Sequence, residues 1–140
     1  MSRQRLLLVG GGHSHLFVLE ALRRRAPEWR DRLAVTMVSR DLQTPYSGML
    51  PGLIAGHYRH NEAHVNLTPL AAAAGVELVE GSIVALDPDA RLAVDAEGRT
   101  HSFDVVSLDI GSTPPLSQVP GHAAGRGARI TGQQFTACHQ

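Results

Sequence analysis

The stretch Arg5-Leu6-Leu7-Leu8-Val9-Gly10-Gly11-Gly12 decides the fold of this chain. A short apolar run that ends in glycine is typical of a strand buried on both faces of a parallel sheet. Residues 13–25 follow with leucines at helical spacing and three arginines in the last turn, and Pro27 is expected to stop this helix. Residues 33–38 read as a second buried strand. Strand, glycine turn, helix and strand therefore predict a βαβ unit.

The glycine turn has a specific physical use. Gly10 permits a sharp bend, and Gly12 has no side chain to keep the backbone away from a pyrophosphate. The helix that begins at His13 points its N–H groups and its positive dipole end at that charge, which Ser14 also approaches. The turn predicts a dinucleotide site, with a glycine turn that binds nothing as the alternative. The third motif position is His15, where Gly or Ala is usual, so either the helix sits slightly away or His15 points outward.

Dinucleotide sites usually place an acidic residue after the second strand, to bind the adenosine ribose. Here Ser39 and Arg40 occupy that region. Ser39 is able to hydrogen-bond a ribose hydroxyl, and Arg40 to stack on adenine or contact a phosphate. The absence of an acidic residue at this position argues against NAD as the ligand more than against FAD. An ordinary exposed turn is the alternative here.

The remaining segments predict further elements. Residues 41–64 read as a loop with one helical turn near 53–55. Asn66 or Thr68 caps a short helix that has Pro69 in its first turn and ends at Gly75. Residues 76–86 predict a strand interrupted by Gly81-Ser82, residues 91–103 a hairpin, and residues 104–110 a last buried strand. Residues 122–140 are expected to form an irregular tail.

Composition excludes some functions. The chain has 140 residues with 13 basic and 13 acidic side chains, so no nucleic-acid partner is expected. Its single cysteine, Cys138, rules out a dithiol mechanism within these residues. No apolar run is long enough to span a bilayer, so we expect a cytoplasmic protein with peripheral membrane contact left open. His57, His60, Glu62 and His64 are a weak zinc alternative in a predicted loop, and we expect no metal.

Three segments together resemble a known family. They are Leu8 to His15, then Val38 to Asp41 with Thr44 to Gly52, and then Asp104 to Ser112. In this order they are similar to the pyridine nucleotide-disulfide oxidoreductases, which are flavoproteins with two dinucleotide sites. The nearest branches are the type II NADH dehydrogenases, the sulfide:quinone oxidoreductases and the flavoproteins linked to selenide, water dikinase. The resemblance covers about residues 5–121.

The resemblance implies a fold and a site. The fold class is α/β, a Rossmann-like FAD-binding half-domain with a parallel sheet and an inserted β-hairpin or meander. FAD would be held by residues in four groups: Gly10, Gly12, His13 and Ser14 at the pyrophosphate, Ser39 and Arg40 at the adenosine, Ser82 and Ile83 at the adenine, and Ser47, Pro51 and Gly111 near the flavin. The catalytic residues stay unknown, because the cofactor carries the chemistry in such enzymes.

The resemblance also implies what lies beyond this chain. Such flavoproteins need a second glycine-rich βαβ unit for NAD(P)H and a later segment that completes the FAD site. We therefore expect residues 1–121 to be an incomplete FAD-binding domain from a truncated or frameshifted product, inactive alone. The full-length protein would be an FAD-dependent, NAD(P)H-linked oxidoreductase with a small-molecule electron donor and acceptor, such as a quinone, and a link to selenide, water dikinase. A nucleotide-binding module without redox activity, using NAD or an adenine nucleotide, is the alternative.

Overall fold

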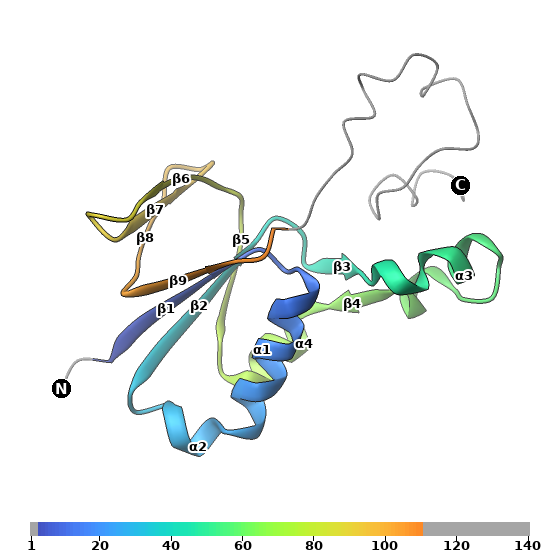
Figure 1. Ribbon diagram of the computed structural model, residues 1–140, viewed down its shortest axis with the longest axis horizontal. Coiled ribbons are helices and arrows are strands. Elements are labelled where there is room, and N and C mark those ends of the chain that lie inside the picture. The colour runs from blue at the N-terminus through green and yellow to red at the C-terminus, as the bar shows by residue number, and fades with distance from the viewer. Residues whose placement is uncertain (1–2, 111–140) are drawn as a thin grey trace, which may run out of the picture. The chain divides into compact units, whose positions relative to one another are not determined.

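Four parallel strands form the main sheet of the computed structural model, which describes residues 3–110 (Figure 1). The strands are β1 (Gln4–Val9), β2 (Leu33–Ser39), β5 (Glu77–Glu80) and β9 (Val105–Leu108), in the order β5-β2-β1-β9. The chain goes from β1 to its neighbour β2 on one side and returns with β9 on the other. The strand order therefore reverses beside β1, and ligands of such sheets bind at the carboxyl ends of the strands at this point.

Helices cover one face of the main sheet (Figure 1). They are α1 (His13–Arg24), the short α2 (Ala26–Trp29) and α4 (Leu67–Ala74). Their apolar side chains meet those of β1 and β2 in one core cluster, made by residues such as Leu8, Leu19, Met37, Leu67 and Ala71. The predicted βαβ unit is thus confirmed. Pro27 lies inside α2 and does not simply stop a helix, because proline is compatible with a first helical turn.

An antiparallel meander packs on the other face of the main sheet. It consists of β6 (Ile83–Asp87), β7 (Leu92–Asp95) and β8 (Thr100–Ser102). Side chains alternate along a strand, so Leu7 and Val9 face away from the helices and join Val38, Ala93 and Phe103 in a second core cluster. The predicted hairpin is confirmed. The strand expected over residues 76–86, interrupted at Gly81-Ser82, has its break at that position, but its two parts belong to different sheets.

Helix α4 has the ends that its sequence predicts. The Asn66 side chain accepts a hydrogen bond from the Thr68 main-chain N–H at 3.0 Å, and Gly75 follows the helix with a φ of 74°. Such a left-handed backbone is most easily adopted by glycine. Asn66, and not Thr68, is therefore the cap.

The described residues divide into two units, one of residues 3–44 and 66–110 and the other of residues 45–65. The predicted loop lies mostly in the second unit and is more ordered than expected. It contains a 3-10 turn η1 (Ser47–Met49), helix α3 (Leu50–Ile54) and a second 3-10 turn η2 (His60–Glu62). Strands β3 (Gln43–Pro45) and β4 (His64–Asn66) pair where the chain leaves and re-enters the first unit. Leu53 and Ala63 are buried, which accounts for this order.

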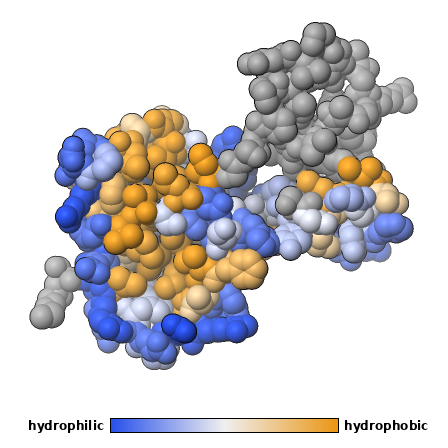
Figure 2. Space-filling model, in the orientation of Figure 1, coloured by the Kyte–Doolittle hydropathy of each residue, from blue (hydrophilic) through white to orange (hydrophobic). Residues whose placement is uncertain are grey.

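The last strand differs most from expectation. The sequence predicts burial, yet β9 has a strand neighbour on one side only within residues 3–110, and Val105 and Leu108 are 55% and 59% exposed. Figure 2 shows the resulting apolar surface on this part of the molecule. No helix within the same residues is long and apolar enough to cross a membrane.

Candidate functional site

The glycine turn lies at the carboxyl end of β1, where the strand order reverses. Gly10 has a φ of +91°, and its N–H donates to the Val38 carbonyl oxygen at 2.8 Å. A Cβ at Gly10 would overlap the Asp109 main chain. The bend therefore needs glycine both for its backbone angle and for its close approach to the segment that follows β9.

Gly12 and Asp109 lie against each other. The Gly12 N–H donates to the Asp109 carbonyl oxygen at 3.0 Å, and the Asp109 N–H donates to the Val9 carbonyl oxygen at 2.8 Å. A Cβ at Gly12 would overlap the Asp109 carboxylate. That carboxylate also accepts the His15 main-chain N–H at 3.0 Å. Sequence reasoning missed this contact, although an acidic residue at the end of an apolar strand was a visible signal.

His15 is buried between α1 and the sheet. Its Nδ1 lies 2.7 Å from the Gly10 carbonyl oxygen and its Nε2 lies 2.9 Å from the Ser107 hydroxyl. A carbonyl oxygen only accepts, so Nδ1 carries the proton, and in the neutral ring Nε2 accepts from Ser107. Of the two expectations for this position, the outward-pointing side chain is wrong. The imidazole instead joins the turn to β9.

The predicted adenosine residues lie at the carboxyl end of β2. Ser39 is buried, and its hydroxyl donates to the Asp41 carbonyl oxygen at 2.7 Å. A Cβ at Gly11 would lie 2.9 Å from this hydroxyl oxygen, so Ser39 is adjacent to the turn. The exposed Arg40 forms an ion pair with Asp41 at 3.2 Å. The structure thus brings Ser39 to the glycine turn.

The predicted adenine residues lie beside Ser39. The Gly81 N–H donates to the Ser39 carbonyl oxygen at 3.0 Å, which places Ser82 at the same edge of the sheet. The Ser82 carbonyl oxygen accepts from the Ala96 N–H at 2.9 Å, and Ile83 begins β6. The Ser82 carbonyl oxygen is therefore already used by the meander.

A buried carboxylate, that of Asp95 in β7, holds the turn of the meander in place. Asp95 accepts hydrogen bonds from the Arg99 side chain at 2.7 Å, from the His101 ring at 3.0 Å and from the main-chain N–H groups of Glu97 and Arg99. Burial raises the pKa of Asp95, but the hydrogen bonds from His101 and Arg99 outweigh it and bring the pKa to about 2. The carboxylate is therefore ionised at neutral pH and fixes the hairpin turn.

Of the remaining predicted residues, two belong to the second unit and one lies outside the described residues. Ser47 begins η1 and Pro51 lies in the first turn of α3, both in the second unit. Gly111 lies outside the described residues, as do Cys138 and the predicted tail. Within residues 3–110, no three His, Cys, Asp or Glu side chains gather as a metal site.

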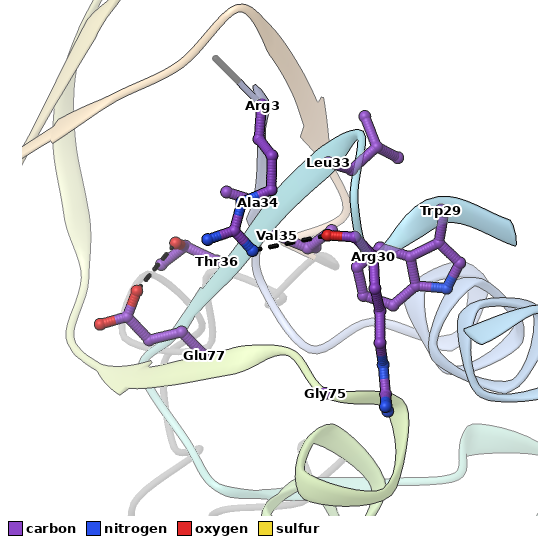
Figure 3. Close-up of a pocket in the computed structure, with 9 residues that line it drawn as sticks. All are labelled: Arg3, Trp29, Arg30, Leu33, Ala34, Val35, Thr36, Gly75 and Glu77. Atoms are coloured by element: carbon purple, nitrogen blue, oxygen red, sulfur yellow. Dashed lines mark hydrogen bonds between the residues drawn. The ribbon is translucent and has the colours of Figure 1, made fainter. Parts of the chain in front are cut away.

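An open pocket of about 270 Å³ lies at the opposite edge of the main sheet, near the amino ends of β2 and β5. Figure 3 shows Arg3 with its guanidinium toward the Arg30 carbonyl oxygen, and Thr36 bonded to Glu77. Its charged side chains are two cations, Arg3 and Arg30, and one anion, Glu77. It lies away from the glycine turn and adds no group to the predicted site.

The fold is shared with solved structures of redox enzymes. The sulfide:quinone oxidoreductase of Aquifex aeolicus matches 79% of this chain and 25% of its own, with a TM-score of 0.67 and 21% identity. The water-forming NADH oxidase of Lactobacillus brevis matches 96% and 32%, with a TM-score of 0.70 and 18% identity. NADH:rubredoxin oxidoreductase of Clostridium acetobutylicum matches 85% and 30%, with a TM-score of 0.65 and 15% identity.

These enzymes are pyridine nucleotide-disulfide oxidoreductases, and the fold they share with this chain is that of Rossmann-like FAD-binding domains. The predicted fold class is thereby confirmed. The chain spans about a quarter to a third of each of these proteins. No protein-family model and no curated protein matches the sequence.

Proposed function

We propose that this chain is the FAD-binding portion of an FAD-dependent, NAD(P)H-linked oxidoreductase and is inactive alone. The observation that carries the proposal is the position of the glycine turn, at the carboxyl end of β1 where the strand order reverses. This is where α/β sheets bind dinucleotides. The fold shared with redox flavoproteins supports the same reading.

The residues at this edge fit a dinucleotide. Gly10 and Gly12 add no side chains of their own to the turn, and Gly12, which directly precedes α1, gives the helix no side-chain cap. Main-chain N–H groups of the first helical turn, at His13 and Ser14, would hold the pyrophosphate. Ser39 and Arg40 would contact the adenosine, and Ser82 and Ile83 would offer main-chain groups to the adenine.

When bound, FAD supplies two-electron chemistry. The protein's own share is then to bind, orient and exclude water. Ser47, Pro51 and Gly111 are proposed to lie near the flavin. The NAD(P)H site, a quinone as electron acceptor, a cytoplasmic location and a link to selenide, water dikinase belong to the same proposal for the full-length protein.

Titration calorimetry of the purified chain with FAD, ADP, NAD and FMN tests the binding proposal. We expect weak binding of FAD, competition by ADP, and no binding of FMN, which lacks the pyrophosphate-linked adenosine. Preference for NAD over FAD would favour the nucleotide-binding module without redox activity. Robust NADH oxidation by the 140-residue chain would contradict the proposed inactivity.

A charge variant locates the binding site. Ser14 is exposed in the first turn of α1, so Ser14→Glu adds a negative charge where the helix dipole favours it. The variant should keep its thermal stability and lose affinity for FAD and ADP by about tenfold or more, through repulsion of the phosphates. Ser102→Glu, on exposed β8, is the matched control and should bind normally.

A further inference from the structure

A negative charge of the protein itself lies at the amino end of α1. Gly12 precedes the helix and has no side chain with which to cap it. Asp109 instead supplies the cap from the end of β9, because its Oδ2 accepts the His15 main-chain N–H at 3.0 Å. This is the amide, third in the helix, that a capping side chain usually satisfies. Asp109 is thus bound as an anion by the predicted anion site.

The contact with Gly12 makes the arrangement more specific. A Cβ at Gly12 would overlap the carboxylate oxygens and carbon of Asp109. The absence of a side chain at Gly12 thus leaves space that the structure fills with this carboxylate. The same space is the one through which the turn would approach a pyrophosphate. A carboxylate and a phosphate a few ångströms apart repel each other, and both accept from main-chain N–H groups at the same helix end.

We propose that Asp109 is an internal competitor of the phosphate ligand, and this inference rests on the proposed dinucleotide function. In the absence of a ligand, its carboxylate caps α1 and holds the glycine turn against β9. When a pyrophosphate binds, the carboxylate leaves the His15 N–H and moves away from Gly12. Asp109 therefore lowers the affinity of the turn for nucleotides.

The first test removes the negative charge of Asp109. Asp109→Asn keeps the shape of the side chain and one oxygen for the His15 N–H, but it removes the charge. In calorimetric titration of the 140-residue chain with ADP and FAD, the variant should bind about fivefold or more tightly than the unchanged chain. The difference should shrink at high salt, because salt screens the repulsion.

Asp31→Asn is the matched control. It also removes one carboxylate, but an exposed one near the amino end of β2, at the opposite edge of the sheet. Its affinity for ADP should stay within about twofold of the unchanged chain, because this edge is more than a Debye length from the turn. Equal tightening by both variants would overturn the inference, since the effect would then come from net charge.

The same titrations distinguish a wrong role for Asp109 from a wrong dinucleotide site. If the unchanged chain binds ADP and Asp109→Asn binds it equally or more weakly, Asp109 is not a competitor, while the dinucleotide site stands. If neither protein binds ADP or FAD, the competitor and the dinucleotide site both fall.

A measurement on the unchanged chain guards against a variant that does not fold. The His15 amide signal, followed by NMR during ADP titration, should shift together with the Asp109 carboxyl carbon signal. A saturating titration that leaves both signals in place would overturn the displacement of Asp109.

Discussion

Gly10 shows at the scale of one residue how this turn restricts its sequence. Its φ of +91° is disfavoured for any residue with a Cβ, and a Cβ would also meet the Asp109 main chain. Backbone cannot move aside as a flexible side chain can. A side chain at position 10 would therefore lower the stability of the fold in two ways, through backbone strain and through steric overlap.

Gly10→Ala should be severely destabilising, by about 3 kcal/mol or more, because backbone strain and overlap with Asp109 add. Gly98→Ala isolates the first cost, since Gly98 has a φ of +79° with nothing within 4 Å of an added Cβ. That control should lose only about 1–2 kcal/mol. Urea unfolding of both variants checks this, and equal losses would show that the close approach to Asp109 is unimportant.

At the scale of single elements, helix α4 and the meander each lead to a prediction about stability. The Asn66 side chain is the N-cap of α4, and the apolar residues of this helix fill the first core cluster. Asn66→Ala should lower the free energy of unfolding by about 0.5–2 kcal/mol, while Asn66→Asp should retain most of it. Urea unfolding measures both, and a loss equal in the two variants would argue against the cap.

The hairpin between β7 and β8 predicts a response to acid. The pKa of Asp95 is about 2 in the folded protein, below its ordinary value of 3.8. A lowered folded pKa means that ionised Asp95 stabilises the fold above pH 3.8, and that this contribution is lost as the pH falls from 3.8 toward 2.

Asp95→Asn should therefore be less stable than the unchanged chain at neutral pH, and the gap in thermal midpoint should narrow between about pH 4 and pH 2. Thermal unfolding followed by circular dichroism across this range measures the gap. Glu97→Gln, on the same turn but exposed, is the control and should leave the midpoint nearly unchanged. A gap that is constant with pH would exclude ionisation of Asp95 as the cause.

Local patterns predict the elements that depend on neighbouring residues. The apolar run, the glycines and the leucine spacing suffice for β1, α1 and β2, and Asn66 with Gly75 suffices for α4. Local patterns do not predict features that depend on residues far away in the sequence. β5 and β6 are separated only by Gly81 and Ser82 but belong to different sheets, and the exposure of β9 follows from its position in the strand order. The contact between Asp109 and Gly12 joins opposite ends of the described chain, so no local pattern contains it.

At the scale of the whole molecule, the face of the first unit shown in Figure 2 has apolar residues gathered over β9 and the meander. Val84, Leu108 and Ile110 are 65%, 59% and 75% exposed. Exposed apolar side chains on a strand with a neighbour on one side only, as β9 has within residues 3–110, favour association between copies.

The purified chain should therefore self-associate at micromolar concentration, and Leu108→Lys should shift it toward the monomer, because a charged residue protects an edge strand. Light scattering after gel filtration measures the mass. Leu86→Lys, on β6, is the comparison and should have a smaller effect, because Leu86 is only 36% exposed. Equal masses for the unchanged chain and Leu108→Lys would contradict a role for this edge.

The pairing of β9 with β1 also affects how the chain folds during its synthesis. Leu6 is paired with Val105, so β1 waits for a strand that is made about a hundred residues later. At about 5–20 residues per second, this is a delay of some 5–20 seconds. During that interval a nascent chain already has the segments of β1, α1 and β2 but lacks Ser107 and Asp109, which anchor the glycine turn. Slowed translation before codon 105 should therefore prolong the period in which the nascent chain needs chaperones.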